Sequence, residues 1–232
     1  QDARNLWSQI CAGIDEVLEI LTTSGLLGVA IANQRESVLL WDEVSGEPLS
    51  PVIGWQDGRA AEFCSHIGSS GPQIKERTGL DLDPMFSAPK MKWLLDHYSP
   101  GSYRLGTLDT YLVSMLTGAY VAEAGTASRT MLMDLQALEW SESLCDLFGI
   151  PSQSLAPIVR SDWCFGDVRP GLPIPSGTPV LSVLADSHAS LYFHSQGASD
   201  VGKVTYGTGS SVMIRTKTAS RVEGLATSVA WL

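Results

Sequence analysis

The sequence lacks the features by which several classes of protein are recognised. It has no apolar run of membrane length, no signal-like start, and no cluster of lysine or arginine beside its net charge of −10. These absences argue against a membrane protein and against a nucleic-acid-binding surface. We therefore expect a soluble, cytoplasmic protein whose partner is neither a membrane nor a nucleic acid.

Cysteine and histidine are scarce and scattered. The 4 cysteines contain no Cys-x-x-Cys pair, and the 4 histidines show no metal-ligand spacing. This pattern predicts neither a metal cage nor a disulfide framework, and it fits a reducing compartment.

The sequence also lacks a complete P-loop or hydrolase motif. Residues 197–203 match most of a Walker A loop, but Val204 occupies the position of the Mg²⁺-binding Ser or Thr. The three residue types of a hydrolase triad stand in a row at 186–188, where adjacent side chains cannot form the relay. Neither motif predicts an activity.

What is present is the pattern of an α/β domain. The chain has 232 residues and 44% hydrophobic content, enough to bury a core. Lys90 and Lys92 lie on an expected helix and are expected to be solvated. The expected helices cover residues 2–23, 59–67, 73–78, 88–97, 107–117 and 141–148, a short one follows residue 186, and the expected strands cover 26–32, 38–41, 52–55, 131–135, 180–185, 203–206, 212–214 and 226–231.

Two neighbouring segments suggest phosphoryl transfer. Asp186 follows an apolar run typical of a buried strand, and a carboxylate at the end of a strand can accept a proton from a hydroxyl. The turn Gly207-Thr208-Gly209 can offer backbone N–H groups to phosphate oxygens. The alternatives are that Asp186 caps a helix and that the glycine-rich turn is a plain hairpin.

Several separated segments together resemble the FGGY carbohydrate kinases, with the glycerol kinase-like branch the most similar. They occur in the family's order and span nearly the whole chain. The segments are Asn33-Gln34-Arg35-Glu36, Trp55-Gln56-Asp57 with Arg59, Thr78-Gly79-Leu80, Gly106-Thr107-Leu108-Asp109, Ala127-Ser128-Arg129-Thr130, Asp186 and Thr205-Tyr206-Gly207-Thr208-Gly209.

The resemblance implies a fold, an activity and a set of site residues. The fold is the ribonuclease H-like, actin-type ATPase fold, a mixed sheet flanked by helices, and the activity is ATP- and Mg²⁺-dependent phosphorylation of a sugar or polyol. Asp186 resembles the general base and a Mg²⁺ ligand, and Ser187 stands where the family has a substrate-binding glutamine. Arg35 and Glu36 resemble the pair that binds substrate hydroxyls, and Trp55 resembles the wall against the carbon chain. The cofactor-binding residues are expected to be Gly207, Thr208 and Gly209.

The sequence departs from the family in extent. The family's first strand and Asp-x-Gly-Thr phosphate loop do not occur in it, and neither does the second, adenine-binding domain. We therefore expect residues 1–232 to form an incomplete, substrate-binding N-terminal domain that does not turn over ATP by itself. The resemblance also allows a homo-oligomer, although no segment of the sequence identifies an interface.

Two other functions remain open at this stage. A non-catalytic sugar sensor on the same fold would keep Arg35, Glu36 and Trp55 but would not need Asp186. An actin-like ATPase would bind phosphate without a sugar pocket.

Overall fold

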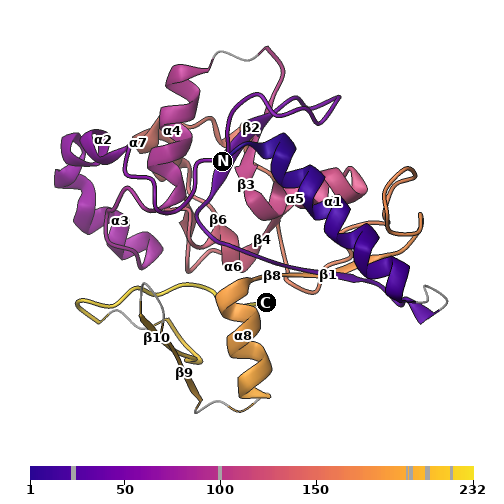
Figure 1. Ribbon diagram of the computed structural model, residues 1–232. Helices are drawn as coiled ribbons and strands as arrows, with labels where there is room; N and C mark the ends of the chain where they lie inside the picture. The colour runs from indigo at the N-terminus through magenta and orange to yellow at the C-terminus, as the bar shows by residue number, and fades with distance from the viewer. Residues whose placement is uncertain (22–24, 99–100, 197, 199–200, 207–209, 220–221) are drawn as a thin grey trace.

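A computed structural model describes residues 1–21, 25–98, 101–196, 198, 201–206, 210–219 and 222–232 (Figure 1). Its α-helices are α1 (Ala3–Ile20), α2 (Ala61–His66), α3 (Gly71–Thr78), α4 (Ser87–His97), α5 (Leu108–Thr117), α6 (Ala124–Ala127), α7 (Glu142–Phe148) and α8 (Asp186–Ser195). The strands are β1 (Val29–Asn33), β2 (Val38–Trp41), β3 (Arg104–Thr107), β4 (Ala122–Glu123), β5 (Met133–Asp134), β6 (Glu139–Trp140), β7 (Ile158–Val159), β8 (Val180–Ala185), β9 (Gly202–Thr205) and β10 (Ser211–Ile214). Two short 3₁₀ turns, η2 (Gly68–Ser70) and η3 (Ser152–Ser154), complete the regular structure of the described part.

The described strands pair two by two, in both parallel and antiparallel ladders. β1 pairs with β8 and β4 with β7 in parallel, whereas β2–β3, β5–β6 and β9–β10 are antiparallel. The mixture of strand directions, with helices between the strands, agrees with the predicted α/β class.

The pairing of β1 with β8 joins two segments that are distant in the sequence. In its register, Asn33 lies opposite Ala185, so both strands end at the same edge. Ile31 and Val183 pack in one core cluster, whereas Ala30 and Ala32 on β1 are exposed, so the pair buries one of its faces. The residues that follow each strand therefore emerge next to each other.

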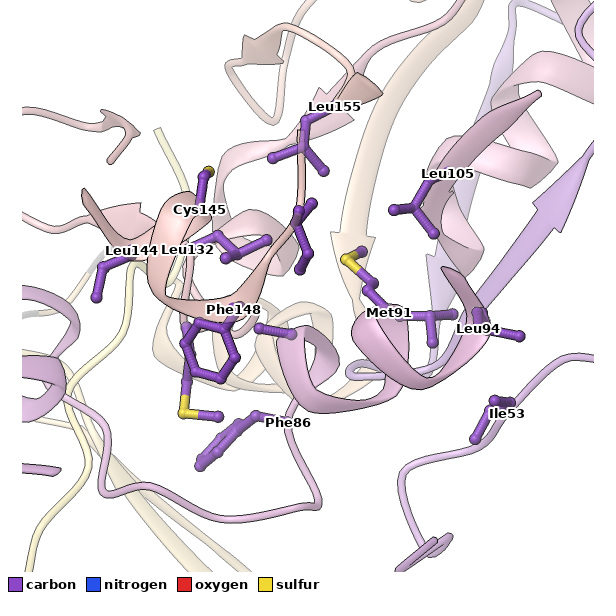
Figure 2. Close-up of a cluster of buried hydrophobic side chains, with 14 of the residues drawn as sticks. Ile53, Phe86, Met91, Leu94, Leu105, Leu132, Leu144, Cys145, Phe148 and Leu155 are labelled. Atoms are coloured by element: carbon purple, nitrogen blue, oxygen red, sulfur yellow. The ribbon is translucent and has the colours of Figure 1, made fainter. Parts of the chain in front are cut away.

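The largest core cluster lies between α4, α7 and β3. Figure 2 shows side chains from these elements converging on one another, among them Met91, Leu105 and Phe148. Each of these three side chains is at most 1% exposed. Burying a side chain of this size stabilises the fold by roughly 1.5–3 kcal/mol, so the cluster holds α4 in place against α7 and β3.

α1 has the amphipathic pattern expected from the sequence. Asp2 caps it by accepting a hydrogen bond from the N–H of Asn5 at 2.9 Å. Trp7 and Ile10 pack against the core, whereas Ile20 near the end of the helix is 80% exposed. None of the helices in the described ranges is both long enough and apolar enough to cross a bilayer.

Three expectations of local structure were wrong or incomplete. Residues 226–231 form no strand, although the segment is apolar. Residues 52–55, expected to form a strand, contribute only a single bridge, between Ile53 and Val38. The strand β3 was not expected from the sequence. Lys90 is 0% exposed rather than solvated, whereas Lys92 is partly exposed.

Candidate active site

The carboxyl ends of β1 and β8 carry the polar residues singled out from the sequence. Arg35 and Glu36 come two and three residues after Asn33, and Asp186 follows Ala185 directly. Figure 1 shows the end of β8 leading straight into α8 beside β1. The carboxyl edge of parallel strands is where α/β proteins gather ligand-binding groups.

Arg35 is the residue that connects the two strand ends. Its Nη1 lies 3.4 Å from Nε2 of His188 in the first turn of α8, across 153 positions of sequence. Burial lowers the pKa of Arg35, the charge of Arg129 lowers it further, and the carboxylates of Glu36 and Asp186 act in the opposite direction. Arg35 is thus within electrostatic reach of Asp186, as the sequence-based hypothesis requires.

Glu36 is held in a conformation that non-glycine residues rarely adopt. Its φ is 62°, and a left-handed backbone costs about 1–2 kcal/mol at such a residue. Its carboxylate accepts a hydrogen bond from Nε of Arg129 at 2.7 Å, and Nε of Arg35 lies 3.8 Å away. Both guanidinium groups therefore fix the direction of this buried carboxylate.

Arg129 belongs to one of the motifs that resemble the family, although no role at the site was expected for it. It follows α6, is 8% exposed, and stacks with its Cζ 4.8 Å from the centre of the Phe86 ring. The signal available in the sequence was one charged residue within Ala127–Thr130, a segment otherwise made of small residues. A lone cation in such a segment needs a buried partner, which Glu36 supplies.

Asp186 is the first residue of α8 and is exposed. Ala185, not Asp186, occupies the N-cap position, and Oδ1 of Asp186 accepts a hydrogen bond from the N–H of Ser187 at 2.6 Å. A carboxylate at the start of a helix lies near the positive end of the helix dipole, and its exposure leaves it accessible to a ligand. The carbonyl of the neighbouring Ser187 accepts a hydrogen bond from Nζ of Lys203 on β9 at 3.2 Å.

His188 is neutral at physiological pH because it is buried among cations. Burial, followed by the charges of Arg35, Arg129 and Lys203, lowers the pKa of His188 to about 3. The neutral imidazole can accept a hydrogen bond from Arg35 through Nε2. His188 is therefore a neighbour of the arginine and not part of a hydrolase relay.

Trp55 stands apart from this group in the loop after Ile53. Its side chain is 42% exposed, which leaves the indole free to cover a ligand. The same loop contains the ion pair between Asp57 and Arg59, whose guanidinium lies 4.4 Å from the centre of the Trp93 ring. The structure thus brings together Arg35, Glu36, Asp186 and Ser187, with Trp55 on a separate loop.

The expected phosphate-binding turn cannot be placed. Gly207, Thr208 and Gly209 lie outside the described residues. Within the described residues, no group of three or more His, Cys, Asp and Glu side chains could hold a metal ion. A single carboxylate such as Asp186 still suits Mg²⁺ that arrives with phosphate oxygens, because Mg²⁺ commonly takes one or two carboxylates beside phosphates and waters.

Comparisons with known proteins agree with this geometry. The model of the FGGY family of carbohydrate kinases, N-terminal domain, matches residues 1–192. The chain is 38% identical to the apulose kinase of Pectobacterium atrosepticum, over 100% of this chain and 49% of the relative. It is 37% identical to the glycerol kinase of Myxococcus xanthus, over 93% of this chain and 47% of the relative.

A solved structure matches the whole described architecture. The crystal structure of Plasmodium falciparum glycerol kinase with ADP superposes with a TM-score of 0.91 at 28% identity, covering 100% of this chain and 49% of that one. The predicted ribonuclease H-like, actin-type fold is thereby confirmed. The chain spans about half the length of the curated relatives it matches. With its family model, relatives and fold in agreement, this chain belongs to the FGGY family of carbohydrate kinases.

Proposed function

We propose that residues 1–232 form the substrate-binding domain of an ATP-dependent kinase that phosphorylates a hydroxyl of a sugar or polyol. The register of β1 and β8 carries the proposal, because it sets Arg35 and Glu36 at the same sheet edge as Asp186. A phosphoryl acceptor must be held by its hydroxyls and deprotonated at one of them, and both kinds of group meet at this edge.

Each residue has a distinct role in the proposed reaction. Arg35 supplies N–H donors and Glu36 supplies acceptor oxygens, a combination that suits neighbouring hydroxyls. Trp55 covers the carbon chain of the sugar, and Ser187 adds a hydroxyl beside the reacting end. Ser187 is shorter than the family's glutamine, so the substrate contact made by that glutamine is removed at this position.

Asp186 acts as the general base in this proposal. It accepts the proton of the acceptor hydroxyl while that oxygen forms a bond to the γ-phosphorus of ATP and the bond to the leaving ADP breaks. ATP is the second substrate, and the carboxylate of Asp186 would help to hold a Mg²⁺ ion bound with it, which would supply positive charge to the phosphates. Gly207, Thr208 and Gly209 are proposed to bind the phosphates through backbone N–H groups.

Binding of the sugar can be tested on the 232-residue chain. Isothermal titration calorimetry with glycerol, apulose and D-xylulose should detect binding of at least one of them, and the chain alone should show no ATP turnover. Absence of binding for all three, together with a folded chain, would contradict the proposed function and favour an ATPase without a sugar pocket.

The role of Asp186 is tested in the full-length protein. Asp186→Asn should lower kcat at least 100-fold, the smaller end of a general base's contribution, while the Kd of the sugar changes less than about 3-fold. Asp15→Asn, at an exposed position on α1, is the matched control and should leave both constants unchanged. Unchanged kcat in Asp186→Asn would contradict the role of Asp186 as general base.

A further inference from the structure

Lys90 is a fully buried lysine whose partners are two carbonyl groups. It lies in the second turn of α4 and is 0% exposed. Its Nζ donates to the carbonyl oxygen of Gly54 at 3.2 Å and to that of Met85. Lysine is almost never fully buried without a partner, so the desolvation of this ammonium group must be offset by what it holds in place.

The two carbonyls belong to the peptide units that lead into two site loops. A peptide unit is planar, so fixing the carbonyl of Gly54 also fixes the backbone nitrogen of Trp55. Fixing the carbonyl of Met85 likewise fixes Phe86, whose ring lies under the guanidinium of Arg129. Arg129 in turn donates to Glu36. One ammonium group therefore connects the backbone of Trp55 with the support of Glu36.

The charges around Lys90 keep it protonated near neutral pH. Burial lowers its pKa to about 8, and the carboxylates of Glu36, Asp57 and Asp83 oppose that shift. Two of these acids, Asp57 and Asp83, come from the Trp55 loop and the loop before α4, which are the segments whose carbonyls Lys90 binds, and Glu36 comes from the segment after β1. An ammonium group has three N–H donors in tetrahedral directions, which suits it to bridging carbonyls from separate loops.

We propose that Lys90 is a positioning residue that sets the spacing between Trp55 and Glu36 and thereby the affinity for the sugar. This inference rests on the proposed function, because it takes Trp55 and Glu36 as sugar-binding groups. Lys90, which lies on α4, was expected from the sequence to be solvated and to take no part in the site. Lys90 acts through the two loops and does not itself contact the substrate.

The first test follows the Trp55 loop without reference to activity. In the chain labelled with ¹⁵N-tryptophan, the backbone amide signal of Trp55, identified by its loss in Trp55→Phe, reports on the hydrogen bond to the carbonyl before it. Lys90→Met should shift this signal, whereas Lys92→Met, two residues along the same helix and paired with Asp96, should not. In the unmodified chain the same signal should titrate between pH 6.5 and 9.5 with a midpoint near 8, so the test stands even if Lys90→Met fails to fold.

The second test measures the sugar. With apulose and glycerol as probes, Lys90→Met should raise the Kd at least 10-fold and Lys92→Met less than 2-fold, and the Kd of the unmodified chain should rise severalfold from pH 7 to 9.5. A Trp55 signal that neither shifts in Lys90→Met nor titrates would overturn the inference. A shifted signal with an unchanged Kd would also overturn it, because Lys90 would then support the fold without affecting sugar binding. If the unmodified chain binds none of glycerol, apulose and D-xylulose while the Trp55 signal behaves as expected, it is the proposed function that fails.

Discussion

The ion pair between Arg129 and Glu36 offers a direct measure of how strongly the candidate site is built into the fold. In Arg129→Met the carboxylate of Glu36 stays buried without its 2.7 Å partner, since the two side chains are only 10% and 7% exposed. Removing one member of a buried pair costs roughly 3–5 kcal/mol. Arg35, whose Nε lies 3.8 Å from the same oxygen, remains as a partial counter-charge and points to the lower end of that range.

Loss of the contact with Phe86 acts in the same direction. A cation above an aromatic ring contributes about 0.5–1 kcal/mol or more, and methionine recovers part of it by packing. We therefore expect Arg129→Met to lower the free energy of unfolding by about 3 kcal/mol. For a chain of this size that corresponds to a Tm lower by about 6–12 °C.

Urea unfolding followed by circular dichroism measures this change, with Arg160→Met as its control. Arg160 also pairs through Nε with a carboxylate, that of Asp162 at 2.9 Å, but these side chains are 61% and 67% exposed. Water screens an exposed pair, so the control should be nearly as stable as the unmodified chain. A loss below 1 kcal/mol in Arg129→Met, or equal losses in both variants, would refute the argument from burial.

Two further predictions concern the same site. Trp55→Ala should weaken sugar binding about 10-fold in calorimetry, equivalent to about 1.4 kcal/mol. Because the side chain is 42% exposed, the free energy of unfolding should change by less than about 1 kcal/mol. An affinity within 2-fold of that of the unmodified chain would count against Trp55 as the wall of the sugar site. His188 has a pKa of about 3 in the folded protein, against an ordinary value of 6.5, so the unfolded chain binds more protons between these values and stability is lost as the pH falls. His188→Gln should remove about 3 kcal/mol of this loss between pH 7 and 4, as measured by urea unfolding at both pH values, and an identical pH dependence in both proteins would contradict the assigned pKa.

The sequence predicted the parts of the fold that depend on local pattern. The apolar runs ending at Asn33 and Ala185 became β1 and β8, and glycines at 118 and 149 end α5 and α7 in the left-handed conformation. The apolar segment at 226–231 was wrongly expected to be a strand because apolarity alone does not supply a strand partner. Its backbone is held instead by scattered bonds, such as that from the N–H of Val229 to Oγ of Ser128 at 3.0 Å.

For the candidate site, the sequence named residues but did not show their surroundings. The family resemblance named Arg35, Glu36 and Asp186, and the register of β1 and β8 brings their backbones together. The burial of Lys90 was not predictable from helical spacing, because lysine on a helix is normally solvated and the acceptors of its ammonium group lie in loops. The left-handed backbone of Glu36 was equally hidden, since glutamate has no preference for that conformation.

The pairing of β1 with β8 also has a consequence for how the protein is made. Contacts across 153 positions, such as that of Arg35 with His188, close a very long loop, and loops of this kind form late and slowly. During synthesis on the ribosome, the first strand must wait for nearly all of the intervening chain before its neighbour emerges. Nascent chains halted before residue 180 would hold Arg35 and Glu36 without the strand that delivers Asp186, and a chaperone that shields β1 during that interval would favour correct folding.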